Sequence, residues 1–426
     1  MPWEPKPAYR LAENTVSVED LKALAEWLTQ DVGATFAAGA PPWVPPHLTQ
    51  GPLVRELEQA FAKKVGAKHA IFVNSGSSAN LLAWYFPRAY DWLVPEKERT
   101  FLPNGDEDQE VNLRVVVPAV AWSTSVMPAY QFGYAPIACE ADPETWGLDP
   151  VDLRRICENV GPPAIVVVVH VLGVPAKMKE IDELRREFGF LLIEDACGAF
   201  GSSPVGKIEE SLTTYSTFFA HQMSTIEGGF ITTNGDDAAN VLRMLRAHGW
   251  AADCDPAWKA ALAKEHGIDP FREKFTFYVP GFNVRNTDLA AHLGLSQMKR
   301  ADAVALARRA NHGLYATKFS GSKDFAIQKK PAGATGAHEV ASIAFGVLAS
   351  SKAHRNKVAA ALQAKGIETR PIGGGNMARQ PFFGKTKRER PLADRIHDCG
   401  FQLPNGPHLT VEDVAYLADT VLAVRP

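Results

Sequence analysis

Cysteine is scarce and scattered in this chain of 426 residues. The five cysteines stand far apart in the sequence, at Cys139, Cys157, Cys197, Cys254 and Cys399. Separated thiols of this kind are typical of reduced cysteines and do not suggest a disulfide framework. None of them belongs to a Cys-x-x-Cys pair, so the sequence does not favour a structural zinc site, and we expect no bound metal.

The chain also lacks long apolar runs, long basic runs and a signal-like N-terminus. No stretch approaches the roughly 20 apolar residues that span a bilayer, and the first residues have no basic region followed by an apolar one. The net charge is −3, from 45 basic and 48 acidic side chains, which favours neither nucleic acid nor an anionic membrane as a partner. We therefore expect a cytoplasmic protein that binds neither of them.

Short apolar runs alternate with helix-like stretches through the first 300 residues. Strands are expected at 69–73, 114–118, 164–170 and 190–196. Fully apolar strands separated by helices predict a mostly parallel sheet that is covered on both faces, which is an α/β fold. Ligands of such sheets bind at the carboxyl ends of the strands, so residues just after these runs are the candidates for chemistry.

The character of the sequence changes near residue 300. We expect an N-terminal segment with a helix at residues 1–50, a large domain at 51–300 and a smaller α/β domain at 301–426. A chain of this length has room for one large and one small domain, each with a filled core.

Within these regions the pattern predicts further elements. In the small domain we expect helices at 301–318 and 352–365, with short strands near 340–348 and 367–371. A helix at 18–30 is expected to pack beside this domain. Two segments interrupt the alternating pattern, a charged and turn-rich one that predicts a surface excursion and one that contains an alanine-rich helix, at residues 93–112 and 250–275.

Residues 74–80 read "NSGSSAN", and they follow one predicted strand and begin a helix. Glycine allows the backbone to approach a ligand closely, and the start of a helix offers free N–H groups to an anion. The turn is therefore either a phosphate cradle or an ordinary helix cap, and the residues alone leave both readings open.

Two further residues also have two readings each. Asp195 ends the apolar run "LLIED", and a buried carboxylate needs a cation or strong donors. A protonated pyridine nitrogen would satisfy Asp195, as would an arginine or the start of the next helix. Trp122, in "PAVAWSTS", is either a flat surface for a planar ring or a tryptophan at the edge of the core.

His221 is the residue with the least obvious role. It stands in "STFFAHQMSTIEGGF" (216–230), between an expected strand and a Gly-Gly turn. On local grounds a histidine in this place is more often a hydrogen-bonded residue at a strand end than a catalytic group.

Taken together, these segments resemble the fold type I pyridoxal-phosphate (PLP) enzymes, and more narrowly the DegT/DnrJ/EryC/StrS sugar aminotransferase family. The resemblance runs through most of the chain and includes the segments "FVNSGSSANLLA", "VPAVAWSTSV", "GLDP", "IEDACGAFGS", "EGGFITT" and "GFNVRNTDLAAHLGLSQM". It implies a fold like that of aspartate aminotransferase, with a large PLP-binding domain and a smaller C-terminal domain. It also implies a homodimer with shared active sites.

One position departs from the family pattern. Aminotransferases of this family carry a lysine in the place of His221 and bind the cofactor covalently through it. A branch of the family with the same exchange, in a similar "H-x-x-[ST]-x-x-E-G-G" setting, removes the C3 hydroxyl from nucleotide-linked 4-keto-6-deoxy sugars. The resemblance therefore implies a 3-dehydratase that holds PLP or pyridoxamine phosphate without a covalent bond and uses His221 as catalytic base.

The resemblance also assigns roles around the cofactor. Gly76, Ser77 and Ser216 are expected to hold the phosphate, joined by Asn283 of the partner subunit.

The remaining roles concern the cofactor ring and the charged ligands. Trp122 would stack on the ring, Asp195 would meet its nitrogen, and His170 and Glu194 would support it. Arg285 and Arg370 are candidates for the carboxylate of glutamate, the expected amino donor, or for the phosphates of the substrate. Ordinary salt bridges are the other reading of these two arginines.

Three alternatives stay open at this point. An ordinary nucleotide-sugar aminotransferase is disfavoured because no lysine stands at position 221. A dehydrase with an iron–sulfur cluster, acting on a CDP-linked sugar, needs a set of thiolates, and Cys254 stands without cysteines near it. A catalytically silent family member that acts as a binding subunit would not need to retain Asp195, Trp122 and the Gly/Ser turn together.

Overall fold

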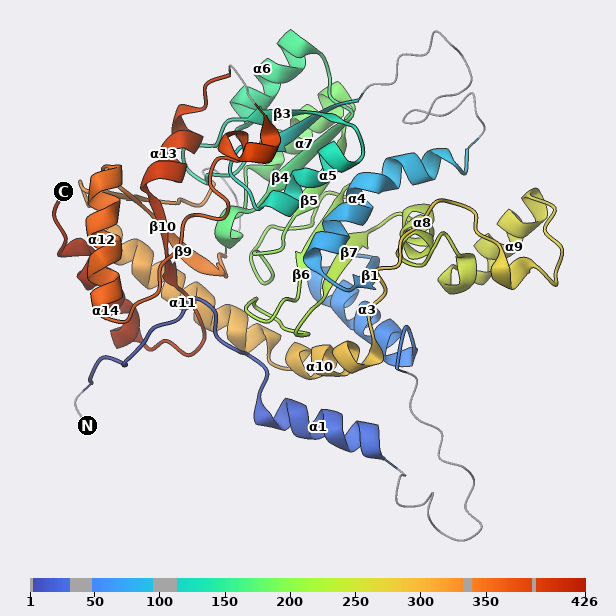
Figure 1. Ribbon diagram of the computed structural model, residues 1–426, viewed down its shortest axis with the longest axis horizontal. Helices are drawn as coiled ribbons and strands as arrows, with labels where there is room; N and C mark the ends of the chain where they lie inside the picture. Colours follow the sequence, from blue (N-terminus) through green and yellow to red (C-terminus); the bar gives the residue numbers. More distant parts are fainter. Residues whose placement is uncertain (1–2, 31–47, 95–112, 332–338, 385–387) are drawn as a thin grey trace.

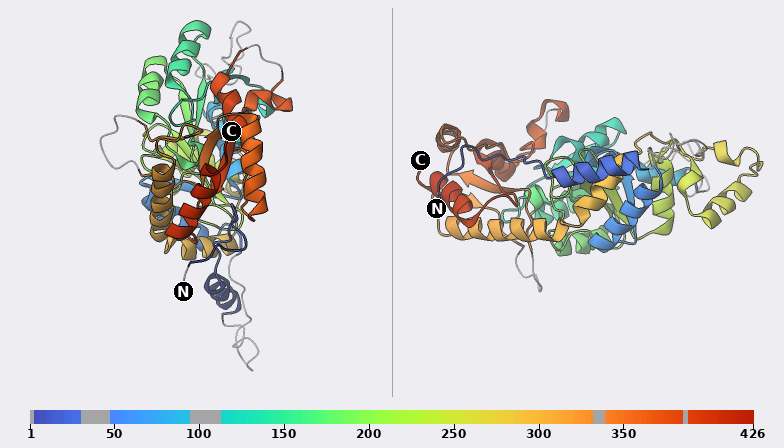
Figure 2. Two further views of the ribbon diagram at one scale, coloured as in Figure 1. Left: turned by 90° about the vertical axis from the view of Figure 1, so that its left-hand side faces the viewer. Right: turned by 90° about the horizontal axis from the view of Figure 1, so that it is seen from below.

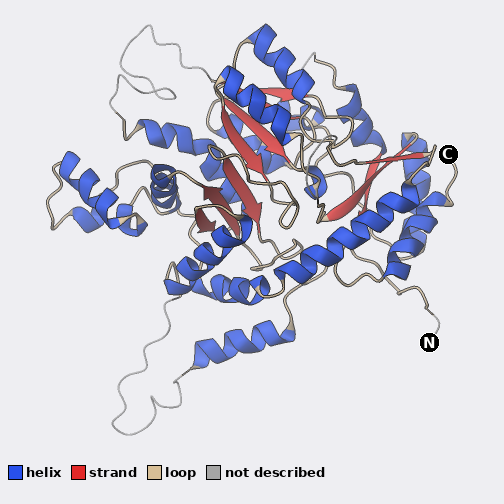
Figure 3. Cartoon of the chain, turned by 180° about the vertical axis from the view of Figure 1, so that it is seen from behind, coloured by secondary structure: helices blue, strands red, loops and turns tan. Residues whose placement is uncertain are grey.

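Two β-sheets of different size organise the chain (Figure 1). The structure is a computed structural model, and it describes residues 3–30, 48–94, 113–331, 339–384 and 388–426. A seven-stranded sheet lies at the centre, and a three-stranded sheet lies beside it near both chain termini. Figure 3 shows the two groups of strands as separate sheets, each with helices around it.

The central sheet is mostly parallel, as the sequence predicts. Its spatial order is β1-β7-β6-β5-β4-β2-β3, and β7 runs antiparallel to its two neighbours while the other pairs are parallel. The predicted strands at 69–73 and 114–118 coincide with β1 and β2, and those at 164–170 and 190–196 contain β4 and β5. The strands are β1 (His69–Val73), β2 (Arg114–Pro118), β3 (Ala135–Cys139), β4 (Ile165–Val169), β5 (Leu191–Asp195), β6 (Leu212–Ser216) and β7 (Gly229–Thr233).

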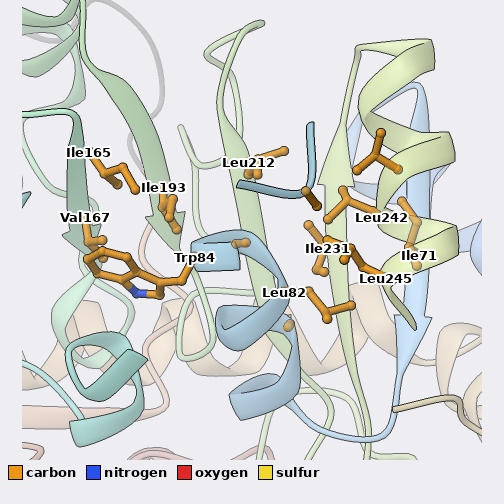
Figure 4. Packing of buried hydrophobic residues seen from close by; sticks show 14 of the residues in the cluster. Ile71, Leu82, Trp84, Ile165, Val167, Ile193, Leu212, Ile231, Leu242 and Leu245 are labelled. Atoms are coloured by element: carbon orange, nitrogen blue, oxygen red, sulfur yellow. The ribbon is translucent and has the colours of Figure 1, made fainter. Parts of the chain in front are cut away.

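Helices cover both faces of this sheet, because alternate side chains of each strand point to opposite faces. One face packs against α4 (Gly76–Asp91) and α8 (Asp236–Arg246). The side chains between them form the core shown in Figure 4, where Leu82 and Trp84 of α4 meet Ile193 and Ile231 of the strands. Each such side chain contributes about 1.5–3 kcal/mol on burial.

The opposite face carries two further clusters. Phe72 and Phe230 pack there against α3 (Pro52–Val65) and α10 (Asp288–Met298). Val166 and Leu192 pack against α6 (Pro150–Val160) and α7 (Met178–Phe188). The result is a three-layer α/β/α arrangement in which Ile193 and Leu192, adjacent in sequence, serve different cores.

The second sheet is antiparallel, in the order β10-β9-β8. The helices predicted at 301–318 and 352–365 correspond to α11 and α12, and Figure 2 shows α11 running as one long helix from α10 to this sheet. The elements are α11 (Ala301–Phe319), β8 (Phe325–Ile327), β9 (Ala344–Ala349), α12 (Lys352–Ala364), α13 (Pro391–Cys399), β10 (Gly400–Pro404) and α14 (Val411–Leu422).

The strand predicted near 367–371 is wrong. Ile367 makes a single parallel bridge to Tyr9, and residues 368–371 belong to no strand, although the Arg370 carbonyl accepts a hydrogen bond from the Gln402 N–H of β10 at 2.9 Å. The strand predicted near 340–348 is β9, displaced to later residues. The partners of β9 are β8 and β10, whose short runs lack a clear alternation in the sequence.

The position predicted for the N-terminal helix is also wrong. Helix α1 (Val18–Thr29) packs against α10 of the large-sheet region, whereas Tyr9, earlier in the chain, joins the core around the small sheet. Buried Asp20 anchors α1 by accepting hydrogen bonds from Ser296, Gln297 and Arg300. Burial alone would raise the pKa of Asp20, but these donors outweigh burial and hold its pKa well below the usual range.

The insert at 250–275 forms a projection beside α8 (Figure 1) that contains α9 (Pro256–Glu265). The insert predicted at 93–112 lies almost entirely outside the described residues. The described residues also contain shorter helices: η2 (Ser123–Ser125), α5 (Met127–Gln131), η3 (Val171–Gly173), η4 (Ala251–Asp253), η5 (Glu273–Phe275), η6 (Met377–Arg379) and η7 (Pro381–Phe383). Within the described parts, none of the helices is both long and apolar enough to cross a membrane.

We propose that the chain has a large domain at 51–300 and a small C-terminal domain at 301–426, following an N-terminal segment at 1–50. The junction at residue 300 is where α10 ends and α11 begins.

Candidate active site

The carboxyl ends of four parallel strands meet at one edge of the central sheet. The chain leaves β1 at Asn74, β2 at Ala119, β5 at Ala196 and β6 at Thr217. The Gly/Ser turn, Trp122, Asp195 and Ser216 follow or finish these strands, so the topology gathers them at this edge.

The Gly/Ser turn begins α4 in close contact with β6. The Ser75 hydroxyl caps the helix by accepting a hydrogen bond from the Ser78 N–H at 3.0 Å. The N–H groups of Gly76 and Ser77, in the first turn, have no acceptor inside the helix. A Cβ at Gly76 would lie 2.6 Å from the Cβ of Ser216, so only glycine allows this approach.

Asp195 is buried at the end of β5 and is held by three neutral donors. Its carboxylate accepts hydrogen bonds from the Asn80 amide at 2.9 Å, the Ser125 hydroxyl at 2.6 Å and the Cys197 N–H at 3.0 Å. The Asn80 amide oxygen accepts in turn from the Thr214 hydroxyl at 2.6 Å. No cationic side chain in the described parts of the chain forms an ion pair with Asp195, so the arginine reading of this residue is not supported.

Trp122 presents its ring to solvent at the same edge. The side chain is 62% exposed, which excludes the core-edge reading of this residue. Its carbonyl accepts from the Ser125 N–H at 3.1 Å. Because Ser125 also donates to Asp195, the exposed ring and the buried carboxylate are joined through one residue.

The C-terminal unit supports the loop that carries Trp122. The Gly374 N–H donates to the Ala121 carbonyl at 2.8 Å, and the Met377 N–H donates to the Ala119 carbonyl at 2.7 Å. Gly373 adopts φ of +50° next to Ala121, where an added Cβ would lie 3.2 Å from the Ala121 carbonyl oxygen. The glycines of "PIGGGN" therefore allow the two units to meet at the edge of the site.

His221 lies on a loop that returns the chain from β6 to β7. The Thr217 N–H donates to the Gly228 carbonyl at 2.9 Å and the Phe219 N–H donates to the Ile226 carbonyl at 2.8 Å, which close the loop. The half-buried His221 ring has one contact within hydrogen-bond range, from Nδ1 to the Ser216 carbonyl at 3.4 Å. Burial, and next the charge of Arg308, lower the pKa of His221 to about 3. The imidazole is therefore neutral near pH 7.

The lysines nearest to His221 in the sequence are engaged elsewhere. The Lys207 ammonium donates to the Val65 carbonyl at 2.7 Å, at the end of α3. Lys259 pairs with Glu273 at 3.2 Å in the projecting insert. Neither of them replaces the lysine that the aminotransferase pattern has at position 221.

His170 and Glu194 do not occupy the place expected around Asp195. They pair with each other at 2.7 Å between His170 Nε2 and Glu194 Oε1. The Ala176 N–H donates to His170 Nδ1 at 3.0 Å, so the other nitrogen carries the proton and donates to Glu194. Since neighbouring strand residues point to opposite faces, Glu194 lies on the face away from Asp195.

Asn283 and Arg285 lie beside β1. The Asn74 N–H donates to the Val284 carbonyl at 3.0 Å, and the Arg285 Nε donates to exposed Asn283 at 3.1 Å. Arg370 is exposed on the C-terminal unit, 3.8 Å from Glu368. Within the described residues, no hydrogen bond or ion pair joins either arginine to Asp195 or His221.

Sequence reasoning missed the residues that hold the site together. Asn80 and Ser125 donate hydrogen bonds to Asp195, and Thr214 donates to Asn80. Burial, and next the charge of Arg308, lower the pKa of His221. Asn80 lies one helical turn after Gly76, so a polar residue on the apolar face of a predicted helix was a usable signal. Arg308 lies far from His221 in the sequence, and no local pattern pointed to it.

A family model for the DegT/DnrJ/EryC1/StrS aminotransferases matches residues 45–422. The chain belongs to this family. The match confirms the resemblance inferred from the sequence segments, and the α/β fold agrees with it.

Individual proteins of the family are similar to most of the chain. The chain is 31% identical over 337 residues to a GDP-4-keto-6-deoxy-D-mannose 3-dehydratase of Escherichia coli O55:H7, covering 78% of this chain and 80% of that protein. It is 30% identical to a GDP-perosamine synthase of Caulobacter vibrioides, covering 85% and 88% of the two chains. A crystal structure of GDP-4-keto-6-deoxymannose-3-dehydratase with a trapped PLP–glutamate geminal diamine is 25% identical, with a TM-score of 0.76, covering 97% and 100% of the two chains.

Proposed function

We propose that this chain is a PLP-dependent 3-dehydratase that removes the C3 hydroxyl of a nucleotide-linked 4-keto-6-deoxy sugar and uses glutamate as amino donor. The observation that carries this proposal is His221 in a site otherwise suited to PLP. Dehydratases of this kind are among the relatives, and one of their structures holds a PLP–glutamate adduct.

The residues of this chain fit the cofactor. Asp195 is a buried carboxylate without an ion-pair partner among the described residues, and it can hold a proton on the pyridine nitrogen. Trp122 offers an exposed flat ring for stacking. The N–H groups of Gly76 and Ser77 and the Ser216 hydroxyl can donate hydrogen bonds to a phosphate. They lie together because Gly76 has no Cβ and can approach Ser216 closely. When bound, the pyridoxamine form of the cofactor supplies an electron sink for the sugar carbons.

His221 supplies the acid–base step. As a neutral imidazole it can accept a proton from the methylene carbon of the cofactor and then donate that proton to the departing C3 oxygen. Acid–base assistance of this kind typically accelerates a reaction by about 10²–10⁴-fold. A lysine in this place could bind the cofactor covalently and return the enzyme to transamination, so the exchange favours the loss of water.

The remaining roles concern the charged ligands. Arg285 and Arg370 bind the glutamate carboxylate or the substrate phosphates, because a guanidinium fits both groups. Asn283 of the partner subunit completes the phosphate site in a homodimer. The exposure of Asn283 supports this role. The five free cysteines support a cytoplasmic location.

The test is an incubation of the purified protein with PLP, glutamate and a 4-keto-6-deoxy sugar linked to GDP, CDP or dTDP. We expect loss of the C3 hydroxyl from one of these substrates, together with 2-oxoglutarate and ammonia. Preparations with and without iron should turn over equally.

Three results would contradict the proposal. Formation of a 4-amino sugar without loss of water would indicate an aminotransferase. A strict requirement for iron and an electron donor would indicate the cluster-dependent reaction. Tight binding of all ligands without turnover would indicate a silent binding subunit.

A further inference from the structure

The middle of the loop that carries His221 is tied to the rest of the fold by one hydrogen-bonding side chain. Among residues 218–226, all of which the structure describes, Gln222 alone hydrogen-bonds to a distant segment. Its amide donates to the Ala341 carbonyl at 3.0 Å and also to the Gly198 carbonyl. The other hydrogen bonds of this stretch join the loop to itself and to the end of the strand before it.

The two acceptors of Gln222 belong to different parts of the fold. Gly198 lies three residues after Asp195, on the turn that follows β5. Ala341 belongs to the C-terminal unit, just before β9. Gln222 therefore connects the loop of the candidate base to the turn of Asp195 and to the C-terminal unit at the same time.

The His221 ring itself is held by little. Its Nδ1 lies 3.4 Å from the Ser216 carbonyl, and the Phe218 ring stands edge-on to it at 6.0 Å between centroids, although Phe218 is 42% exposed. His170, by contrast, is oriented through both of its ring nitrogens. A base must keep a nitrogen free to take its proton, so the direction of such a ring has to come from the backbone that carries it.

Gln222 can supply that direction. Its side chain is 2% exposed, so water does not compete for its two donors. Met223, the next residue, is also buried, in the cluster around Phe72 and Phe230, but apolar packing has no preferred direction. Hydrogen bonds weaken steeply away from their best angle, and two of them to separate segments fix the chain directly beside His221.

We propose that Gln222 is a positioning residue that fixes the direction of the His221 ring and leaves the ring nitrogens free for the substrate. The inference rests on the proposed function, in which His221 is the base. It makes the C-terminal unit a part of this support, because Ala341 is one of the two acceptors. A misplacement of about 1 Å can lower a rate by about 10²-fold, so a small displacement of the loop is enough to affect catalysis.

The test compares Gln222→Met with Gln328→Met. Methionine has nearly the length of glutamine but lacks the two donors. Gln328 is the matched control because it is also buried, and its amide donates to the Thr145 carbonyl at 2.8 Å and to the Val171 carbonyl at 2.9 Å. In both glutamines Oε1 has no hydrogen-bond partner. Each variant therefore loses two buried hydrogen bonds, but only one of them loses bonds of the His221 loop.

The readout is NMR relaxation of the His221 ring in protein with isotope-labelled histidine, with the signal assigned from His221→Asn. In the wild type and in Gln328→Met we expect the His221 ring to be as ordered as the His170 ring. In Gln222→Met we expect the order parameter of the His221 ring to fall below about 0.6, the range of flexible groups. An unchanged order parameter in folded Gln222→Met, or an equal fall in Gln328→Met, would overturn the proposal.

Two further measurements apply if Gln222→Met does not fold. Gln222→Asn retains the amide on a side chain that is shorter by one methylene, and it should lower the order of the His221 ring by a smaller amount; wild-type order in this variant would count against the proposal. The wild-type protein needs no replacement at all. A wild-type His221 ring that moves as freely as the ring of exposed His266 would refute the proposal.

Turnover adds a separate readout. If the dehydration occurs, Gln222→Met should lower kcat by about 10- to 100-fold with KM and pyridoxamine phosphate affinity unchanged, whereas Gln328→Met should keep the wild-type kcat. In a His221→Asn background Gln222→Met should lower the rate no further, and a further loss would contradict an action through His221. Because ring order is measured without turnover, failure of the proposed reaction and failure of the Gln222 proposal give different results.

Discussion

Two buried carboxylates, Glu194 and Asp195, and two histidines, His170 and His221, differ in how far the fold uses their polar atoms. Glu194 and Asp195 are neighbours at the end of β5, both are buried, and neither forms an ion pair with a lysine or arginine of the described residues. His170 uses both ring nitrogens in hydrogen bonds inside the fold. His221, on the loop after β6, makes one contact within hydrogen-bond range, to the Ser216 carbonyl at 3.4 Å.

The comparison teaches that burial of a carboxylate does not by itself mark a ligand site. Glu194 is as buried as Asp195, yet it lies on the face away from the Gly/Ser turn and Trp122. What distinguishes the Asp195 side is capacity for binding that the fold leaves unused, namely the hydrogen-bonding groups of the His221 ring and of the first amides of α4, and the exposed face of Trp122 for stacking. Unused capacity at a strand edge is what a ligand can engage.

The largest effect is expected when His221, the histidine that the fold leaves almost free of hydrogen bonds, is replaced. His221→Asn should lower the dehydration rate by about 10²–10⁴-fold, because it removes the base. Pyridoxamine phosphate affinity and thermal unfolding should stay close to the wild type, since His221 contributes little to the hydrogen bonding of the fold. Steady-state kinetics, a binding titration and a melting curve check this prediction. A variant with the full rate would show that another group is the base.

The next effect concerns Glu194. Glu194→Ala leaves the His170 ring N–H and the Gly206 N–H without their acceptor. Each buried donor without a partner costs about 1–3 kcal/mol, so the free energy of unfolding should fall by about 3 kcal/mol in a urea titration. Cofactor affinity of the folded protein should be unchanged. Glu210→Ala removes an exposed glutamate and is the control, expected within about 0.5 kcal/mol of the wild type. If both variants unfold alike, the structural role of Glu194 is wrong.

Asp195→Asn should produce the reverse pattern. Loss of the charge on the ring-nitrogen partner should weaken cofactor binding by about ten- to a hundredfold, the equivalent of one charge-assisted hydrogen bond. Stability should fall less than in Glu194→Ala, because the asparagine oxygen can still accept from Cys197 or from Asn80, so that one buried donor is left unpaired in place of two. Quenching of tryptophan fluorescence by added cofactor measures the affinity. The contrast between the two carboxylates would be lost if Asp195→Asn unfolded easily and still bound cofactor normally.

The smallest effect extends the comparison to a buried histidine outside the site. Burial, and next the charge of Lys330, lower the pKa of His312 to about 4. The unfolded chain binds a proton below about pH 6.5, where folded His312 does not, so stability is lost as the pH falls from 6.5 toward 4. We expect about 1–2 kcal/mol less stability at pH 5 than at pH 7.5 from this residue. His312→Gln should show a shallower pH dependence of unfolding, and an equal slope would exclude this contribution.

Much of the fold could be predicted from local patterns. The apolar runs at 69–73 and 114–118 coincide with β1 and β2 because strands buried on both faces must be apolar throughout. The prediction of a strand near 367–371 was wrong, because the short strands of a small antiparallel sheet have too few residues for their alternation to be recognised in the sequence. The position predicted for α1 was wrong because its Asp20 accepts hydrogen bonds from Ser296 and Gln297 of α10, more than 270 residues later in the chain.

The same division applies to the site. The residue types of Trp122, Asp195 and His221, each after an expected strand, pointed to one edge of the sheet and to the family. Segments such as "IEDACGAFGS" carried that resemblance because close backbone packing and strand-end chemistry constrain adjacent residues. Arg308 could not be found in this way, because it lies on α11, whose packing depends on the whole chain. Asn80 carried a weaker signal, as a polar residue one helical turn after Gly76.

By itself, the sequence determined the layered α/β architecture, the family and the histidine that stands in place of a lysine, since each depends on residues close together along the chain. Only the tertiary structure decided which of two adjacent carboxylates faces the site, and which distant side chains, such as Asn80 and Thr214, hold it there. Those outcomes depend on the direction in which a strand presents its side chains and on contacts between distant segments, and both arise only when the chain is folded.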